Sequence, residues 1–364
     1  MAKTFRQVFE KHQFKKPSTT TAVALLATGA VLAASAILVR RRTRRTERNN
    51  PPMGRFLKVD GVHLHYIERG RGEPLVLLHG NGSMGREFDI AGLVDMASEH
   101  YRVIVFDRPG FGHSERPRDR IWTPEAQAAL LHKALGRLGV ESAVVFGHSW
   151  GTQVALALAL NHSAMVKSLA LSSGYYFPEV RADVLPMSLP AAPVIGPLLR
   201  HTIAPWIGRL AWPLTSRKLF GPSRISRDFA ARFPMWMCLR PSQLRAGAAE
   251  TALMIPSAIS LSHRYDCLRM PVVLIAGDSD RVVSAEGQTV RLHDTLPLSE
   301  MRLVPAGGHM IHHVTPHEVM LAIDRAAQAP TLEATSGVSP FGSQPKSESS
   351  SYVRSPKQAA TSAG

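Results

Sequence analysis

The residues Gly147-His148-Ser149-Trp150-Gly151 form a Gly-x-Ser-x-Gly pattern. The apolar segment at 143–146 precedes it and is typical of a strand, and a helix is predicted over 151–161. In a strand–turn–helix context the serine is held in a strained turn, and the flanking glycines keep neighbouring backbone from clashing. A serine hydroxyl needs an adjacent base to attack at neutral pH. The pattern therefore predicts a nucleophile at Ser149, in preference to a serine that only caps a helix.

Five motifs in order resemble the α/β-hydrolase superfamily, in the branch that holds esterases, epoxide hydrolases, dehalogenases and proline iminopeptidases. They are LLHGNG (77–82), DRPGFGHS (107–114), GHSWG (147–151), AGDSDRVV (276–283) and GGHMIHH (307–313). The resemblance covers residues 55–325 and is much more specific for the fold than for the substrate.

The resemblance implies a catalytic triad of Ser149, His309 and Asp280. Ser149 would attack an electrophilic carbon, His309 would carry the proton, and Asp280 would orient the imidazole. Asp278 is the competing acid, but the family's acid follows the glycine at 277 by three residues, which selects Asp280. His312 and His313 lie near His309 in the chain, and we expect them to be surface or lid-contacting residues.

The resemblance also implies that backbone N–H groups of Asn81 and Trp150 form the oxyanion hole. Haloalkane dehalogenases use side chains at these positions to hold halide, but those enzymes and the related epoxide hydrolases have an aspartate nucleophile. Ser149 occupies that position here, which argues against both activities. The remaining motif residues His79, Arg108 and His113 are predicted to hold loops beside the site.

Strands and helices alternate along the chain. Two strand-like runs lie within 55–78, and further ones lie at 102–106, 143–146, 168–173, 271–277 and 301–305. Helices are predicted at 124–138, with Thr123 as N-cap, at 151–161 and near 285–296. This order predicts an α/β fold with a mostly parallel central sheet and helices on both faces. The hydrolase core would comprise residues 55–174 and 269–327.

Residues 175–268 interrupt the alternation. They are rich in Pro, Trp and Met and contain no strand-like run, so we predict an inserted helical lid. Residues 328–364 are rich in Ser, Pro, Gly and Thr, a composition that cannot build a core and predicts a disordered tail.

The N-terminal region indicates a membrane anchor. A basic segment (1–20) precedes an uncharged apolar run (21–39), and a basic linker (40–54) follows it. As a helix, the apolar run is ~28 Å long, close to the ~30 Å of a bilayer's hydrocarbon core. A cleaved signal peptide and a buried soluble helix are the alternatives. The arginines that follow the run place the catalytic domain on the cytoplasmic side by the positive-inside rule.

Charge and cysteine content exclude several classes. The net charge of +15 comes from two patches: residues 1–50 contribute +9 and residues 175–270 contribute +7, so the rest is close to neutral. The basic run beside the apolar segment is better explained as a topology signal than as a nucleic-acid site. Cys238 and Cys267 have no metal-ligand spacing and are predicted to be free, buried thiols. We expect no metal, no cofactor and no nucleic-acid partner.

The predicted activity is hydrolysis of a carboxylic ester, of a lipid or another apolar acyl compound, by a membrane-anchored enzyme. A proline iminopeptidase, another amide hydrolase or an acyltransferase could use the same triad. An iminopeptidase needs acidic lid residues to bind the substrate amine, and the lid offers few in a strongly basic segment: Glu179, Asp183, Asp228, Glu250 and Asp266. A noncatalytic scaffold would have a broken triad, and this one is intact.

Overall fold

Eight strands form one sheet in the order β1-β2-β4-β3-β5-β6-β7-β8 in a computed structural model that describes residues 18–329. The strands are β1 (Arg55–Val59), β2 (Val62–Arg69), β3 (Glu73–Leu78), β4 (Tyr101–Phe106), β5 (Ala143–His148), β6 (Val166–Ser172), β7 (Val272–Gly277) and β8 (Ser299–Val304). The pairs β1–β2 and β2–β4 are antiparallel, and all the others are parallel. This confirms the predicted fold class.

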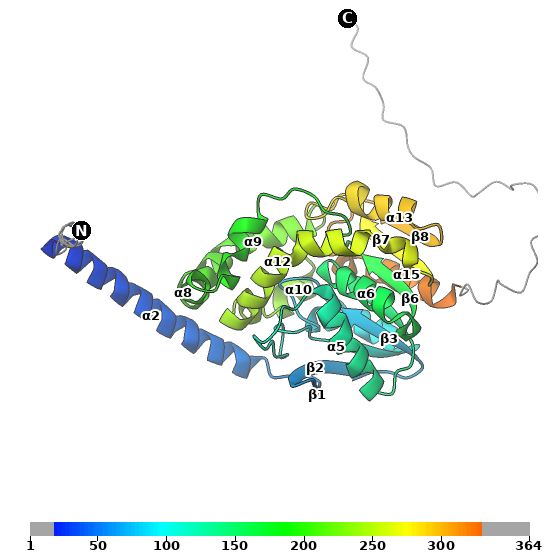
Figure 1. The fold of residues 1–364 in the computed structure, drawn as a ribbon, viewed down its shortest axis with the longest axis horizontal. Helices are drawn as coiled ribbons and strands as arrows, with labels where there is room; N and C mark the ends of the chain where they lie inside the picture. Colours follow the sequence, from blue (N-terminus) through cyan, green and yellow to red (C-terminus); the bar gives the residue numbers. More distant parts are fainter. Residues whose placement is uncertain (1–17, 330–364) are drawn as a thin grey trace, which may run out of the picture. The chain divides into compact units, whose positions relative to one another are not determined.

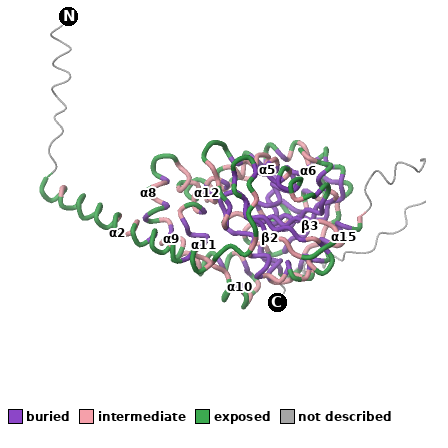
Figure 2. Tube along the Cα trace, turned by 90° about the horizontal axis from the view of Figure 1, so that it is seen from below, coloured by how far each residue is buried: buried purple, intermediate pink, exposed green. Residues whose placement is uncertain are grey.

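Helices cover both faces of the sheet (Figure 1). On one face α5 (Pro124–Arg137) and α6 (Trp150–Asn161) pack on the alternate strand residues Val76 and Leu78. On the other face α3 (Arg86–Ile90), α4 (Leu93–Ser98) and α15 (Pro316–Gln328) pack in the cluster that contains Leu75 and Leu77. The alternation follows from the two-residue period of a strand, and the strands are the most deeply buried part (Figure 2).

Local details differ from the sequence prediction. The first strand-like run is a hairpin, because Asp60 and Gly61 both have positive φ and turn β1 into β2. The helix expected near 285–296 is a π-helical turn, Ala285–Val290, followed by α13 (Arg291–Thr295). Thr123 caps α5 as predicted, accepting a hydrogen bond from Ala126 N–H. Both cysteines are free, but only Cys238 is buried, and the prediction of a buried Cys267 is wrong.

The segment 175–268, which we call the insertion, is helical and has no strand in its described residues. It contains α7 (Val184–Ser188), α8 (Ile195–Thr202), α9 (Ala204–Phe220), α10 (Arg227–Arg232), α11 (Met235–Cys238) and α12 (Pro241–Ser262), besides short 3₁₀ turns. A fully buried ion pair between Arg108 and Glu250 of α12 joins the insertion to the core, with Nη1 and Oε1 2.5 Å apart.

Helix α2 (Thr19–Asn49) is longer than the predicted apolar span, because it continues through the basic residues that we expected to form a linker. Arginine and glutamate are good helix formers, and Pro51-Pro52 stops the helix only afterwards. Ser18 caps its start by accepting a hydrogen bond from Thr21 N–H. Among the described residues, α2 is the one helix long and apolar enough to cross a membrane. Residues 1–17 of the predicted basic segment and 330–364 of the predicted tail lie outside the described residues.

Candidate active site

Ser149 lies in the turn between β5 and α6, with φ +54° and ψ −122°. This left-handed backbone is strained for a non-glycine residue, and a hydrogen bond from Ser149 N–H to the Ser172 carbonyl holds it. A Cβ at Gly147 would lie 2.9 Å from backbone atoms of the first turn of α6, and one at Gly151 would lie 2.3 Å from the Leu78 carbonyl oxygen. Both glycines are therefore required by the close approach of strand, turn and helix.

A chain of two hydrogen bonds runs from Ser149 through His309 to Asp280. His309 Nε2 is 3.0 Å from Ser149 Oγ, and its Nδ1 is 2.7 Å from Asp280 Oδ2. The second carboxylate oxygen of Asp280 accepts hydrogen bonds from the N–H groups of Val282 and Val283. The carboxylate accepts at both ends, so Nδ1 carries the hydrogen and Nε2 faces the serine as an acceptor.

The competing residues occupy different positions. Asp278 is exposed, and its carboxylate contacts the Ser279 hydroxyl. His312 is completely buried against His148 and Phe88, so the expectation of a surface or lid-contacting residue is wrong for it. His313 is also buried, and it does contact the insertion, where its ring packs on Phe229. Sequence spacing to His309 does not reveal burial, which depends on how α14 (Ile311–Val314) packs beneath the site.

The two predicted oxyanion donors flank Ser149. Gly80 lies so close that a Cβ there would be 3.0 Å from Ser149 Cβ, which brings the following Asn81 N–H beside the turn. Trp150 opens α6, where an N–H has no partner within the helix. Neither N–H donates a hydrogen bond within residues 18–329. The Asn81 side chain points to α12, donating to the Gly247 carbonyl and to Thr251 Oγ1.

Arg108 and His79 support the loop that carries Asn81. The Arg108 guanidinium donates to the carbonyls of His79 and Gly80 and pairs with Glu250. His79 accepts a hydrogen bond from Arg108 N–H through Nε2. Burial, with a smaller contribution from the Arg108 charge, lowers the pKa of His79 to about 3. A neutral imidazole is therefore built into this loop at physiological pH.

A buried cluster that the sequence analysis did not identify lies behind His309. His148 donates through Nε2 to the His309 carbonyl over 3.1 Å, and its Nδ1 lies 3.8 Å from Glu87 Oε1. Burial raises the pKa of Glu87 to about 7. His148 is part of the serine motif, but nothing in that motif indicates its contact with His309. Among the described residues, Glu87, His312 and His313 form the one group whose donor atoms, within 4.8 Å of one another, could hold a metal ion.

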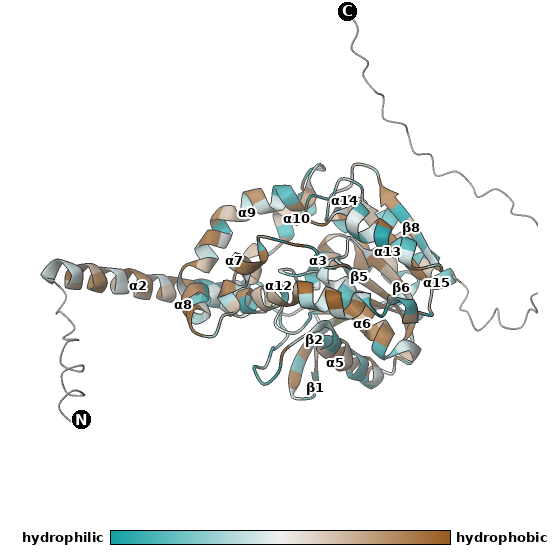
Figure 3. Ribbon diagram, turned by 45° about the horizontal axis from the view of Figure 1, so that its top comes forward, coloured by the Kyte–Doolittle hydropathy of each residue, from teal (hydrophilic) through white to brown (hydrophobic). Residues whose placement is uncertain are grey.

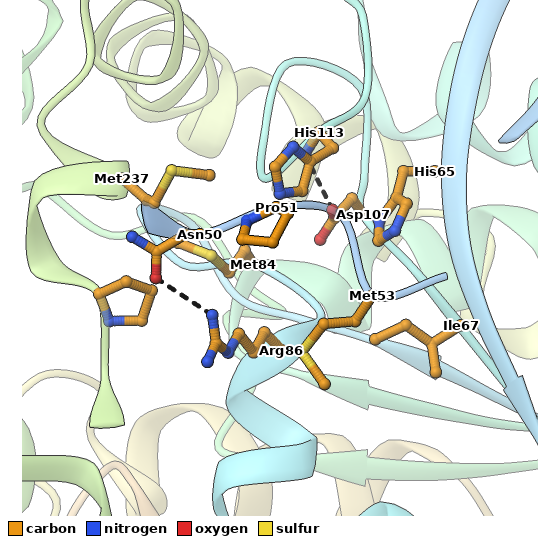
Figure 4. Close-up of a pocket in the computed structure, with 11 residues that line it drawn as sticks. Asn50, Pro51, Met53, His65, Ile67, Met84, Arg86, Asp107, His113 and Met237 are labelled. Carbon is orange, nitrogen blue, oxygen red and sulfur yellow. Dashed lines mark hydrogen bonds and ion pairs between the residues drawn. The ribbon is translucent and has the colours of Figure 1, made fainter. Parts of the chain in front are cut away.

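A cavity of about 50 Å³ lies beside Ser149 and His309. Ser149, His309 and Asn81 line it from the core, and Leu219, Phe229 and Phe233 line it from the insertion. A separate cavity of about 20 Å³ (Figure 4) lies where residues 50–53 cross the core, and it contains no member of the Ser149–His309–Asp280 chain. There Asp107 accepts hydrogen bonds from His65 Nδ1 and His113 N–H, which hold the DRPGFGHS loop. His113 and Arg108 thus contact loops beside the site and do not line the Ser149 cavity.

Comparison with known proteins gives one family. The family described as alpha/beta hydrolase fold matches residues 73–316. Over 136 residues the chain is 31% identical to 2-hydroxy-6-oxo-6-(2'-aminophenyl)hexa-2,4-dienoic acid hydrolase from Metapseudomonas resinovorans, a match that covers 36% of this chain and 47% of that protein. The chain thus matches about half the length of that relative.

Two further similarities extend over most of the chain. Haloalkane dehalogenase 2 of Mycobacterium tuberculosis is 24% identical over 280 residues, which cover 75% of this chain and 94% of that protein. The crystal structure of a membrane phospholipase A superposes with a TM-score of 0.59 at 21% identity, and the match covers 85% of this chain and 98% of that one. At this identity the superposition shows a common fold.

Proposed function

Because this chain belongs to the alpha/beta hydrolase fold family, we propose that it is a membrane-anchored serine hydrolase that cleaves a carboxylic ester. In this proposal Ser149 is the nucleophile, His309 the general base and acid, and Asp280 the residue that orients His309. The observation that carries it is the continuous hydrogen-bond chain from the Ser149 hydroxyl to the Asp280 carboxylate.

The reaction would proceed in two halves. Ser149 Oγ attacks the ester carbonyl carbon while His309 Nε2 takes the hydroxyl proton, and the resulting tetrahedral oxyanion is stabilised by the N–H groups of Asn81 and Trp150. His309 then gives its proton to the departing alkoxide, which leaves as the alcohol and yields an acyl-enzyme. A water molecule, deprotonated by His309, attacks the acyl carbonyl carbon, and the bond to Ser149 Oγ then breaks as His309 returns the proton to that oxygen, which releases the acid and restores the free enzyme. Asp280 stays ionised and stabilises the imidazolium in both halves.

The cavity lining favours a small or apolar acyl group. A typical pocket for a drug-sized ligand encloses about 300–1,000 Å³, whereas the space beside Ser149 is about 50 Å³. A long acyl chain therefore requires Leu219, Phe229 or Phe233 to move. All three belong to the insertion, and we accordingly assign residues 175–268 the role of a lid.

The alternative activities have weaker support. An iminopeptidase would need a lid carboxylate near Ser149, but Glu250 is paired with Arg108, and Glu179 and Asp183 are paired with Arg181. None of these carboxylates lines the cavity. A dehalogenase resembling the mycobacterial relative would need an aspartate where this chain has Ser149. An acyltransferase remains a variant of the proposed reaction, in which an alcohol replaces water in the second half.

Labelling with a fluorophosphonate tests the nucleophile. The full-length chain in detergent should be labelled and should hydrolyse p-nitrophenyl esters, and Ser149→Ala should lose both, with turnover falling at least ~10³-fold. Ser83→Ala is the matched control, because Ser83 lines the same cavity but contacts Glu87 and no imidazole. The control should keep its labelling. Near-normal turnover by Ser149→Ala would contradict the whole assignment.

Membrane fractionation tests the anchor. We expect the full-length chain to remain in the membrane pellet after an alkaline carbonate wash, and a chain lacking residues 1–45 to be released, because the apolar run is then removed. The truncated protein keeps the contact between Glu47 and Arg240 but loses those of Ser35 and Arg42 with the insertion. Release of the full-length chain by carbonate would show that α2 does not span the bilayer.

A further inference from the structure

Helix α9 exposes an apolar stripe. Ile203, just before the helix, and Ile207, Leu210 and Leu214 within it follow the i, i+4, i+7, i+11 spacing of a single helix face. All four are exposed, Leu210 by 80% and Leu214 by 71%. The opposite face contains the buried residues Pro205, Ser216 and Phe220. An amphipathic helix of a soluble protein faces the core with its apolar stripe. Helix α9 packs on the core through Trp212 and Phe220 and exposes this second apolar stripe as well.

The stripe begins beside α2. Ser35 of α2 donates to the Thr202 carbonyl over 2.7 Å and accepts from Trp206 Nε1 over 2.9 Å, which binds the α8–α9 corner to the middle of α2. Figure 1 shows α8 next to this helix, and in Figure 3 the hydropathy colours show apolar segments in both α2 and α9. The two apolar surfaces therefore meet at this corner.

The contact at Ser35 sets the depth of the corner. Ser35 lies four residues before Val39, the last residue of the apolar run, which is about 6 Å along a helix axis. If α2 spans the bilayer with Val39 at the edge of the hydrocarbon, the corner lies about 6 Å inside that edge, next to the headgroup layer, which is roughly 5–8 Å thick on each side.

The side chains around the corner suit this depth. The indoles of Trp206 and Trp236 are 5.6 Å apart, and the Arg42 guanidinium stacks on Trp236. Tryptophan is enriched at membrane–water interfaces, and basic residues beside it attract anionic headgroups. The basic residues Arg209, Arg217 and Lys218 of α9 are exposed.

We propose that the apolar stripe of α9 is a membrane-docking surface that inserts into the interfacial layer of the same bilayer that α2 crosses. The partner is a phospholipid surface, with acyl chains against the stripe and headgroups against the basic side chains. The inference rests on the proposed anchor. It extends the proposed function, because an apolar ester dissolved in the bilayer would lie next to the insertion.

Helix α9 also connects this surface to the reacting groups. The stripe begins at the end of α9 that lies beside α2. At the other end of the helix, Leu219 lines the Ser149 cavity, and its carbonyl accepts hydrogen bonds from the N–H groups of His309 and Met310. Pro213, inside the helix, cannot donate to the helical ladder and separates the two halves. Binding of the stripe to lipid would therefore fix the position of the helix whose last turn forms one wall of the cavity.

Spin-label accessibility tests the docking surface. In a Cys267→Ser background, which removes the exposed thiol, nitroxides are attached at Leu210→Cys, at Leu26→Cys in α2 and at Leu321→Cys in α15 of the full-length chain. All three native side chains are exposed. The protein is reconstituted in phosphatidylcholine vesicles that contain phosphatidylglycerol. Collision with apolar oxygen and with a polar nickel chelate is measured at each label. We expect positions 26 and 210 to favour oxygen and position 321 to favour the nickel chelate.

The reference labels separate the two hypotheses. Oxygen preference at 26 with nickel preference at 210 would overturn the docking surface and leave the anchor intact. Nickel preference at 26 would overturn the anchor and, with it, the inference. Low collision with both reagents at 210 would also overturn it, and spin–spin broadening there would identify a second copy of the chain as the occupant. A Leu210→Asp/Leu214→Asp variant should abolish oxygen preference at Ile207→Cys, whereas the matched Leu321→Asp variant should retain it.

Discussion

The N–H of His309 donates a hydrogen bond of 3.0 Å to the carbonyl of Leu219, the penultimate residue of α9. The insertion therefore does more than cover the cavity, since it supplies an acceptor to the backbone of the imidazole that faces Ser149. Gly308 permits this contact, because a Cβ at that position would lie 2.5 Å from the Phe220 carbonyl oxygen. Movement of the insertion and the position of His309 are consequently linked.

The role of Asp280 can be separated from that of Asp278. In Asp280→Asn the amide would present N–H donors to His309 and favour the tautomer that cannot take the Ser149 proton, so kcat should fall by on the order of 10²–10⁴. Asp278→Asn, at an exposed carboxylate, should change kcat by less than about tenfold. The measurement is turnover of a soluble ester at saturation, with circular dichroism to confirm folding. A larger loss at Asp278 would reverse the assignment.

The glycine at 151 should not tolerate a methyl group. Its Cβ would lie 2.3 Å from the Leu78 carbonyl oxygen, so Gly151→Ala must push α6 away from β3. We expect a loss of about 1–3 kcal/mol in the free energy of unfolding, as for overpacked cores. Gly136→Ala in α5 is the control, because nothing lies within 4 Å of its Cβ, and it should gain about 0.5–1 kcal/mol from helix propensity. Equal stabilities in thermal unfolding would contradict the close packing.

Phe233 should limit acyl length. Its ring lines the Ser149 cavity and stacks on Phe229 with 4.4 Å between centroids. Phe233→Ala enlarges the space, and each buried methylene contributes about 0.8 kcal/mol. The ratio of kcat/KM for octanoyl over acetyl p-nitrophenyl esters should rise by at least ~10-fold, since burying only two further methylenes accounts for that change. The ratio does not depend on the amount of active protein, so a general loss of folded enzyme does not affect it. An unchanged ratio would show that the acyl chain does not bind beside Phe233.

Acid should destabilise the loop that carries Asn81. Burial lowers the pKa of His79 from 6.5 in the unfolded chain to about 3 in the folded one, so below pH 6.5 the unfolded state binds a proton that the folded state excludes. The contribution of neutral His79 to the free energy of unfolding is fully present above pH 6.5 and is lost as the pH falls towards 3. The loss is on the order of 1–2 kcal/mol at pH 5.

His79→Gln should reduce this loss, because its amide can accept from Arg108 N–H without titrating. The measurement is the change in free energy of unfolding between pH 7 and pH 5, from denaturant titrations. His263→Gln, at an exposed histidine, should retain the full loss. If His79→Gln and the wild type lost equal stability, protonation of His79 would not be the cause.

Local patterns predicted the parts of the fold that depend on neighbours in the chain. Short apolar or alternating runs predicted the strands, and Thr123 with Pro124 predicted the start of α5, because hydrophobic pattern and capping are properties of short segments. The glycines around Ser149 follow from the turn itself. The choice of Asp280 over Asp278 came from the resemblance, and the structure places Asp280 beside His309.

Only the tertiary structure determined the relationships between distant segments. The contact of His148 with His309, the pairing of Arg108 with Glu250 and the burial of His312 join residues whose separation in the chain carries no periodic signal. The outward orientation of the apolar stripe of α9 was likewise determined only by the tertiary structure. Its spacing predicts an amphipathic helix, but which side is exposed depends on the elements that pack against the other side, and the contact of Ser35 with Trp206 shows that the stripe begins beside α2.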